Sequence, residues 1–252
     1  MMMRVGLPKN KNLKKSVPDF LAACGVAIAP AEDRKDYTAI SGDGFDGVAC
    51  SLKQDTLIRW VAEGRLQAGI VGLDCATEFN LAAAAASGAD GDAPRVEVAG
   101  ALGIGECSLK IAVSNRMNVS DVRDLQGMRF ATSFPNILRA FLAENGVEAG
   151  EIVEMDGSVE MAIALGEADA IMDLVETGAS LRANNLKAVF DVMAVEAVVI
   201  RPVQMNTPAV RALVSRLVGA ASDAEPKDNS AARSQDSADR PAVMRPLVAR
   251  VA

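Results

Sequence analysis

The residues best suited to chemistry lie close together, in the stretch 168–181. An apolar pattern over Ala170–Leu174 predicts a strand that delivers the carboxylate of Asp173, and a helix pattern begins at Leu181. The loop between them offers hydroxyls and small residues, namely Thr177, Gly178, Ala179 and Ser180. Unpaired backbone N–H groups and the positive end of the helix dipole converge on such a loop, and small side chains let an anion approach. This order of elements predicts a phosphate site.

Two carboxylates, Asp173 and Glu176, flank this loop. Like charges repel, so neither is suited to bind the phosphate itself. Both are better placed to accept hydrogen bonds from sugar hydroxyls beside it, and the stretch therefore predicts a phosphoribosyl site. The alternative is an ordinary strand-to-helix turn with a capped helix, of which any α/β protein has several.

A second loop of this kind follows the predicted strand Met128–Thr132. Thr132, Ser133 and Asn136 could offer hydrogen bonds to pyrophosphate or triphosphate oxygens. The alternative is a helix that simply starts at Pro135 and Asn136, because proline is favoured in the first helical turn.

The composition bounds the class of protein. The 252 residues are half apolar and 23% charged, which is typical of a globular protein large enough for one large or two small domains. The formal net charge of −7 argues against a general surface for nucleic acid or an anionic membrane. No run of ~18 apolar residues predicts a membrane span, and the first residues lead straight into a strand pattern rather than a signal peptide.

Histidine is absent from the sequence. This excludes Ser-His-Asp and Cys-His hydrolases and any histidine-based metal site. Acid–base work must then fall to carboxylates, lysine or the substrate. The four cysteines are scattered without the spacing of a metal site and lie in apolar or small-residue settings. They predict buried free thiols, which suit a reducing compartment, and we expect a cytoplasmic protein.

Strand patterns alternate with helix patterns along most of the chain, which predicts parallel or mixed sheets covered by helices. The strand-like segment Val189–Val199 returns the chain toward the first series of elements, so two lobes with a central cleft are expected. Ligands of open α/β sheets bind at the carboxyl ends of the strands. Lobe I is predicted to comprise residues 1–102 and 189–220, and lobe II residues 103–188. Residues 221–252 are rich in Ser, Asp, Ala, Arg and Pro, and we predict a disordered tail.

Four blocks of sequence occur in an order that is specific when taken together. They are Arg4–Pro8, Ala101–Leu109, Met128–Gly146 and Gly157–Leu186. On these blocks the chain, from Arg4 to about Val218, resembles the catalytic subunit of the ATP phosphoribosyltransferase family, in its short form. The resemblance implies an α/β fold with two lobes of the periplasmic-binding-protein type (type II).

The resemblance also implies the reaction, which is the first step of histidine biosynthesis. N1 of ATP would attack the anomeric carbon of 5-phosphoribosyl 1-pyrophosphate (PRPP), and pyrophosphate would leave. Catalysis would depend on holding two polyanions in line, with Mg²⁺ carried by the substrate phosphates. The implied partners are a second copy of the chain and a regulatory subunit resembling histidyl-tRNA synthetase, with neither nucleic acid nor membrane.

On this resemblance, the site residues fall into two groups. The PRPP group comprises Asp173, Glu176, Thr177, Gly178, Ala179 and Ser180. Glu160 is a possible catalytic residue facing the cleft; the alternative is a carboxylate at a helix start, which could form part of a capping box. The group for ATP and pyrophosphate comprises Lys9, Asn10, Lys11, Arg34, Lys53, Asp74, Thr132, Ser133 and Asn136.

The sequence departs from the family pattern in lobe I. Asn12 ends a turn without the usual glycine, Lys53 stands where arginine is common, and Gln67 replaces an aspartate. Lysine keeps the positive charge and loses the two-pronged guanidinium. These departures leave an inactive regulatory paralogue open as an alternative. A two-lobe small-molecule binding protein is the other alternative, because it would have the same fold.

Overall fold

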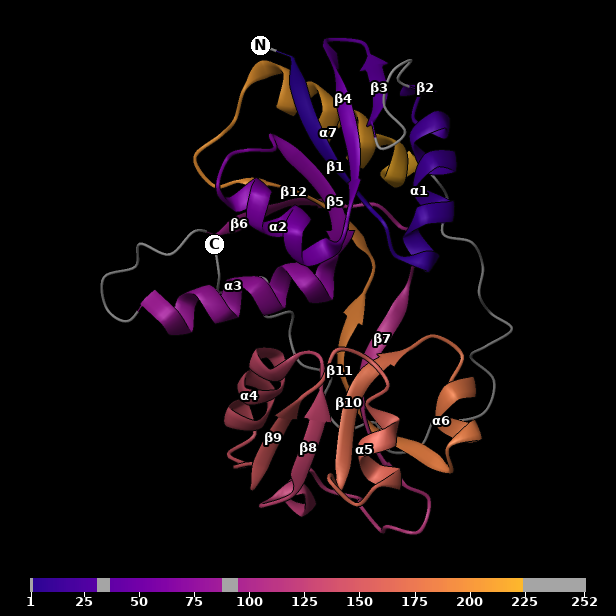
Figure 1. The fold of residues 1–252 in the computed structure, drawn as a ribbon, viewed down its shortest axis with the longest axis vertical. Coiled ribbons are helices and arrows are strands. Elements are labelled where there is room, and N and C mark those ends of the chain that lie inside the picture. Colours follow the sequence, from indigo (N-terminus) through magenta and orange to yellow (C-terminus); the bar gives the residue numbers. More distant parts are fainter. Residues whose placement is uncertain (1, 31–36, 88–94, 224–252) are drawn as a thin grey trace. The chain divides into compact units, whose positions relative to one another are not determined.

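The structure, a computed structural model, describes residues 2–30, 37–87 and 95–223. They divide into two units: unit 1 contains the described residues up to Gly105 and from Glu196 onward, and unit 2 contains Glu106–Val195. Each unit is built around one sheet (Figure 1). The division falls a few residues beyond the expected positions 102/103 and 188/189, because the strands that enter and leave unit 2 pair with each other as far as Cys107 and Val195.

The sheet of unit 1 has seven strands in the order β2-β3-β4-β1-β5-β12-β6. Strand β1 is parallel to its neighbours β4 and β5, whereas the other neighbouring pairs are antiparallel. The carboxyl ends of β4, β1 and β5 therefore lie at one edge. The bounds are β1 (Met3–Pro8), β2 (Ala27–Pro30), β3 (Tyr37–Gly42), β4 (Phe45–Leu52), β5 (Ala68–Gly72), β6 (Val96–Ala101) and β12 (Ala197–Pro202).

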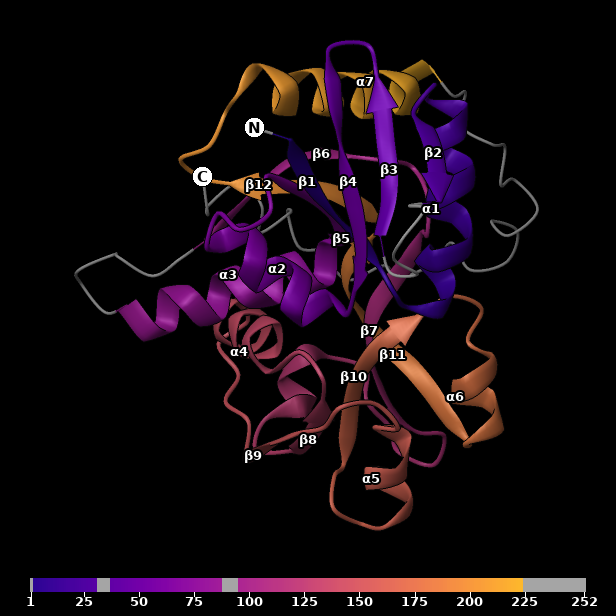
Figure 2. The same cartoon turned by 45° about the horizontal axis from the view of Figure 1, so that its top comes forward.

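Helices cover both faces of this sheet (Figures 1 and 2). Helices α1 (Lys11–Ala23) and α7 (Pro208–Asp223) pack on the face that carries Val5 and Ile70. Helices α2 (Gln54–Ala62) and α3 (Leu73–Ser87) pack on the opposite face, which carries Val71 and Val198. Unit 1 is thus a layered α/β/α structure.

The sheet of unit 2 has five strands in the order β11-β7-β10-β8-β9. Strands β8, β9 and β10 are parallel, and β7 is antiparallel to both of its neighbours. Each parallel strand leads into a helix at the same edge of the sheet. The bounds are β7 (Cys107–Ser114), β8 (Arg129–Thr132), β9 (Glu151–Glu154), β10 (Ala170–Val175), β11 (Leu186–Val195), α4 (Pro135–Glu144), α5 (Glu160–Ala164) and α6 (Ala179–Ala183).

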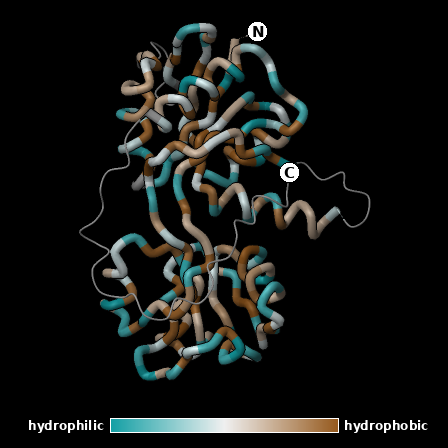
Figure 3. Tube along the Cα trace, turned by 180° about the vertical axis from the view of Figure 1, so that it is seen from behind, coloured by the Kyte–Doolittle hydropathy of each residue, from teal (hydrophilic) through white to brown (hydrophobic). Residues whose placement is uncertain are grey.

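Helices α5 and α6 share one face of this sheet. Val159 beside α5 and Leu181 of α6 pack against Ala112 and Ile171 of the central strands. Figure 3 shows the same pattern along the chain, with hydrophobic residues concentrated in the strands and hydrophilic residues in the turns. The parallel strands that carry this carboxyl edge are therefore held by an apolar core.

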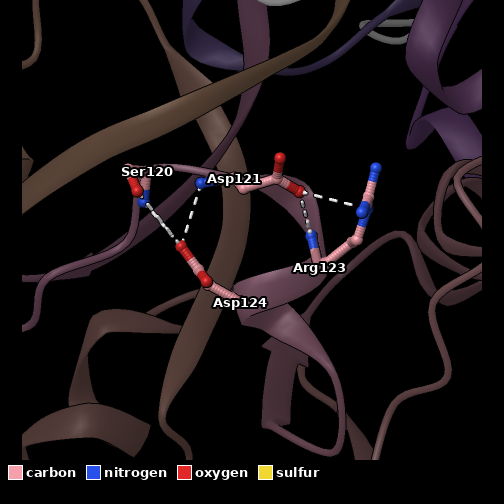
Figure 4. A network of polar contacts seen from close by, with 4 residues as sticks. All are labelled: Ser120, Asp121, Arg123 and Asp124. Carbon is pink, nitrogen blue, oxygen red and sulfur yellow. Dashed lines mark hydrogen bonds and ion pairs between the residues drawn. The ribbon is translucent and has the colours of Figure 1, made fainter.

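At the other edge, a short 3-10 helix, η2 (Val122–Leu125), precedes β8. Asp121 accepts a hydrogen bond from the backbone N–H of Arg123 at 2.9 Å, and Asp124 accepts them from the backbone of Ser120 at 2.8 Å and of Asp121 at 2.9 Å (Figure 4). This reciprocal capping satisfies N–H groups that the short helix leaves unpaired.

The structure corrects one predicted element. The strand-like segment Val189–Val199 is two strands, because β11 ends at Val195 in the sheet of unit 2 and β12 begins at Ala197 in that of unit 1. The alanine run within Leu81–Pro94 predicts a helix end followed by a surface loop, and the helix end is confirmed: α3 continues through the alanines to Ser87 and extends past the strands of unit 1 in Figures 1 and 2. Residues 88–94 lie outside the described residues.

The predicted tail is only partly within the structure. Helix α7 continues to Asp223, so residues 221–223 are helical, and the rest of the tail lies outside the described residues. Across the described ranges, no helix is long and apolar enough to cross a membrane.

Candidate functional site

Three loops meet at the carboxyl edge of unit 2. In the sheet, Thr132 at the end of β8 lies opposite both Met172 of β10 and Glu154 of β9, so the three parallel strands reach this edge at similar positions. The loops that follow lead into α4, α5 and α6. They bring together the PRPP group, Glu160 and the Thr132–Asn136 loop, as their strand-to-helix positions predict.

The loop after β10 is open to an anion. Gly178 has a φ of 70°, a left-handed conformation that glycine adopts without strain, and it stands directly before α6. Thr177, Ala179 and Ser180 are exposed, and the hydroxyl of Thr177 accepts a hydrogen bond from the N–H of Ala179 at 3.4 Å. The helix α6 begins at Ala179, two residues before the predicted start at Leu181, and it is only one short turn, so its dipole adds little.

Arg182 lies against this loop from within α6. Its Nη1 atom donates a hydrogen bond to the carbonyl oxygen of Thr177 at 3.0 Å. The same nitrogen lies 3.1 Å from the position that a Cβ atom on Gly178 would occupy. A guanidinium group therefore stands beside the one residue of the loop that has no side chain.

Asp173 and Glu160 form an acidic pair beside the loop. Burial raises the pKa of the Asp173 carboxyl, and the nearby charge of Glu160 raises it further, against a hydrogen bond from the backbone N–H of Leu174 at 2.8 Å. Glu160 is the first residue of α5, after Val159 in the capping position. The alternative of a helix-start carboxylate therefore stands for Glu160, although Val159 at the capping position cannot form a capping box.

The loop after β8 is held by its own polar side chains. Thr132 is fully buried, and its hydroxyl donates to the carbonyl oxygen of Met172 at 2.8 Å and accepts from the N–H of Phe134 at 3.0 Å. The hydroxyl of Ser133 donates to the carbonyl oxygen of Met155 at 2.7 Å. Asn136 accepts a hydrogen bond from Arg139 at 3.2 Å. The Thr132 hydroxyl thus serves to join β8 to β10, whereas the prediction had it facing a ligand.

One charged residue at this edge, Lys110, was not predicted from the sequence. Lys110 lies in the middle of β7, opposite Asp173 of β10 on one side and Asp191 of β11 on the other. Its Nζ atom forms an ion pair with Asp191 at 2.6 Å. The available signal was a single lysine within an otherwise apolar strand.

In unit 1, the carboxyl edge of β4, β1 and β5 carries most of the group predicted for ATP. The backbone N–H of Lys9 donates to the carbonyl oxygen of Leu52 at 2.9 Å, and that of Gly72 donates to Oε1 of Gln54 at 2.7 Å. These bonds join the three loops. Lys9, Asn10 and Lys53 are exposed there. The side chain of Lys11 and all of Arg34 lie outside the described residues.

Asp74 lies in the first turn of α3 and is only 2% exposed, unlike the exposed Lys9, Asn10 and Lys53. Its Oδ1 atom is buried without a hydrogen-bond partner among the described residues, and Oδ2 accepts a weak bond from the thiol of Cys75 at 3.6 Å. Burial raises the pKa of this carboxyl. Asp74 folds back against Gly72, where a Cβ atom would overlap Oδ1.

Gln67 stands at the opposite edge of the same sheet. It precedes β5, is 8% exposed, and its Oε1 atom accepts a hydrogen bond from the backbone N–H of Arg4 at 2.8 Å. Gln67 therefore joins β1 to β5 at their amino ends. Its replacement of an aspartate lies away from the carboxyl edge that carries Lys9 and Lys53.

The similarity of this chain to known proteins identifies its family. A model of the HisG family, ATP phosphoribosyltransferase, matches residues 53–219, which is more than half of the chain. The chain belongs to the ATP phosphoribosyltransferase family. The matched region begins at Lys53 and includes all three strand-to-helix loops of unit 2. It does not include Lys9, Asn10, Lys11 and Arg34, which precede it.

Individual members of the ATP phosphoribosyltransferase family align over most of the chain. The protein of Maricaulis maris (strain MCS10) is 38% identical over 199 residues, which are 79% of this chain and 64% of that protein. The protein of Stenotrophomonas maltophilia (strain R551-3) is 35% identical over 216 residues, 86% of this chain and 69% of that protein. The alignment thus spans about two thirds of the length of these relatives.

Solved structures show the fold. The ATP phosphoribosyl transferase (HisG:HisZ) complex from Thermotoga maritima matches with a TM-score of 0.65 at 20% identity, over 88% of this chain and 100% of that chain. The periplasmic aliphatic sulphonate binding protein SsuA from Escherichia coli matches with a TM-score of 0.54 at 16% identity, over 88% and 68%. The predicted α/β fold of the periplasmic-binding-protein type is confirmed.

Proposed function

We propose that this member of the ATP phosphoribosyltransferase family transfers the 5-phosphoribosyl group from PRPP to N1 of ATP and releases pyrophosphate, the first step of histidine biosynthesis. The observation that carries the proposal is the open loop at Thr177–Ser180, with Gly178 in a left-handed conformation, within the region that matches the family. Its exposed hydroxyls and N–H groups suit a terminal phosphate.

The parts of PRPP are assigned by charge. The loop residues Thr177–Ser180 bind the 5-phosphate, and Asp173 and Glu176 accept hydrogen bonds from the ribose hydroxyls. The bond from adenine N1 to the anomeric carbon forms while the bond from that carbon to pyrophosphate breaks. Positive charge develops on the sugar ring during this exchange, and the paired carboxylates of Asp173 and Glu160 are suited to stabilise it.

The nucleotide is assigned to the carboxyl edge of unit 1. The triphosphate would receive positive charge and hydrogen bonds from five residues, namely Lys9, Asn10, Lys11, Arg34 and Lys53. Asp74 would lie behind the loop that follows β5. The exposed positions of Lys9, Asn10 and Lys53 support this assignment. Lysine suits phosphate as a mobile point charge, even without the fixed geometry of arginine.

We propose Mg²⁺ as the cofactor, carried by the substrate phosphates, where it would neutralise pyrophosphate as it leaves. Within the described ranges, no group of three or more His, Cys, Asp or Glu residues could hold a metal ion. Mg²⁺ fits such a protein because it keeps several waters and takes phosphate oxygens with few protein ligands.

The proposed assembly is a homodimer that joins a regulatory subunit resembling histidyl-tRNA synthetase. The similar structure from Thermotoga maritima is a complex of HisG with HisZ, which supports a separate partner. We also propose a cytoplasmic location, because ATP and PRPP are substrates found inside the cell.

The test is a pyrophosphate-release assay with ATP, PRPP and Mg²⁺, run with and without the regulatory subunit. The proposal expects release that requires both substrates, together with a phosphoribosyl-ATP product. Binding of PRPP without turnover under both conditions would instead indicate a binding protein or an inactive paralogue.

A further inference from the structure

Three charged side chains form a row across the sheet of unit 2. Lys110 of β7 lies directly opposite Asp173 of β10 and Asp191 of β11. Residues directly opposite each other in antiparallel strands project from the same face. The row lies on the face that α5 and α6 cover, one step beyond the apolar pair Ala112 and Ile171. It therefore borders the edge where the PRPP loop begins.

The carboxyl edge of unit 2 is rich in negative charge. Five carboxylates lie at or just beyond the ends of β9 and β10, namely Glu154, Asp156, Glu160, Asp173 and Glu176. Such an edge repels a substrate that carries a phosphate and a pyrophosphate unless cations offset it. Magnesium bound to pyrophosphate offsets only part of this charge.

Few protein cations are available at this edge. Among the described residues of unit 2, four of the seven Lys and Arg residues lie at the opposite edge, in or before the first residues of β8 and β11 or just after β7: Arg116, Arg123, Arg129 and Lys187. Arg139 and Arg182 lie on the helices α4 and α6. Lys110 alone among these seven lies opposite Asp173 in the sheet.

We propose that Lys110 is a PRPP-binding residue, whose ammonium group offsets the charge of Asp173 and Glu160 and contacts an oxygen of the bound phosphoribosyl group. This inference rests on the proposed function, because it names a further residue of the same site. The Lys110 side chain is 27% exposed, so its charge is partly shielded from solvent, whereas the Asp191 side chain is 53% exposed. A charge in partly buried surroundings acts more strongly on its neighbours than one in water.

Asp191 keeps the ammonium group in place. Strand β11 departs from regular pairing between Asp191 and Met193, and such bulges redirect neighbouring side chains. The alternative is a cross-strand ion pair that only stabilises the sheet. The two roles differ in what substitution of each partner does to PRPP binding, because only Lys110 carries the positive charge.

The experiment compares Lys110→Met with Lys187→Met by isothermal titration of the full chain with PRPP and Mg²⁺, and by steady-state kinetics. Lys187 lies opposite Val113, at the far end of β11, so its loss removes the same charge from the same unit. Lys110→Met is expected to weaken PRPP binding and raise its KM about tenfold or more, the size of one hydrogen bond to a charged group. Lys187→Met should bind like wild type, and Lys110→Arg should recover most of the affinity.

Asp191→Asn separates a binding role from a structural one. It removes the ion pair and keeps the ammonium group, so PRPP affinity should fall by less than about threefold. If Lys110→Met binds like Lys187→Met, or if Lys110→Met and Asp191→Asn lose affinity equally, the proposal is overturned. Because binding is measured apart from turnover, PRPP binding without pyrophosphate release would contradict the proposed function and leave the Lys110 result intact.

Discussion

Gly178 is the residue whose substitution tests the PRPP loop most directly. Its φ of 70° disfavours any residue with a Cβ atom, and a Cβ there would lie 3.1 Å from Nη1 of Arg182. Gly178→Val adds a branched side chain in the space assigned to the phosphate. We expect the KM for PRPP to rise by about tenfold or more, with a smaller rise for ATP. Steady-state kinetics with each substrate varied in turn measures both.

Gly146 provides the matched control for backbone strain. It also has a positive φ, of 66°, and has nothing within 4 Å of an added Cβ atom. Gly146→Val should cost stability, at roughly 1–2 kcal/mol for a left-handed residue, and leave the KM for PRPP unchanged. Equal KM values for Gly178→Val and wild type would remove this loop from the site.

The hydroxyl of Thr177 supports a second, more conservative test. Thr177→Val keeps the shape of the side chain and removes the group that accepts the N–H of Ala179. We expect the apparent KM for PRPP to rise about 3- to 10-fold, as for the loss of one hydrogen bond, with little change in thermal stability because the residue is exposed. An unchanged KM would exclude Thr177 as a phosphate ligand.

At the scale of residues, the sequence predicts where the site residues lie better than where their side chains point. Strand-to-helix order places the residues after β8 and β10 at one edge, as the structure has them. The inward direction of Thr132 depends on the pairing of β8 with β10, which one sequence does not reveal. Lys110 escaped notice for the same reason, since its neighbours come from strands about 60 and 80 residues further along.

At the scale of elements, Asn80 joins α3 to the start of β6. Its Nδ2 atom donates to the carbonyl oxygen of Val96 at 2.8 Å, and its Oδ1 atom accepts from the N–H of Val96 at 3.0 Å. The side chain is 7% exposed. Asn80→Ala would leave two backbone groups of Val96 without these partners, so we expect a loss of about 2–4 kcal/mol in the free energy of unfolding. Urea denaturation measures it.

Thr77 on the same helix gives the comparison. It is also buried, at 8% exposed, but its hydroxyl bonds only to the carbonyl oxygen of Leu73 within α3, at 2.7 Å. Thr77→Val should cost less than about 1 kcal/mol, because the helix keeps its backbone hydrogen bonds. If both variants lose the same free energy of unfolding, the hydrogen bonds from Asn80 to Val96 contribute no more to stability than the bond of Thr77 within α3.

The bounds of the helices and strands show which elements could be predicted from local signals in the sequence. Local signals placed the starts of α4 and α6 to within two residues, because Pro135 and Gly178 lie at or just before them. The division of Val189–Val199 was missed because both strands are apolar and Glu196 between them carries no turn signal. The helix end predicted at the alanine run is confirmed by α3, since alanine is the strongest helix former.

At the scale of the whole molecule, two carboxyls, one in each unit, make contributions to stability that change with pH in opposite directions. In unit 2, hydrogen bonds from Arg129 hold the pKa of Asp169 below its ordinary value of ~4. The stability from this contact is present above the unfolded-state pKa and is lost as the pH falls through the folded-state pKa. In unit 1, burial holds the pKa of Asp74 above its ordinary value. The contribution of Asp74 to stability is fully present below its unfolded-state pKa of ~4 and is lost as the pH rises through its folded-state pKa.

Two variants therefore predict pH profiles of opposite sign. Asp74→Asn removes a carboxyl that is costly to ionise, so it should raise Tm at pH 7, by roughly 2–4 °C per kcal/mol gained, with the gain shrinking toward pH 4. Asp169→Asn removes a carboxylate that is hydrogen-bonded to Arg129, so it should lower Tm at pH 7, with the loss shrinking toward pH 3. Thermal unfolding of both variants and the wild type between pH 3 and 8 measures the two differences. A pH-independent gain for Asp74→Asn would show that this carboxyl ionises in the folded state as readily as in the unfolded chain, and that burial does not govern it.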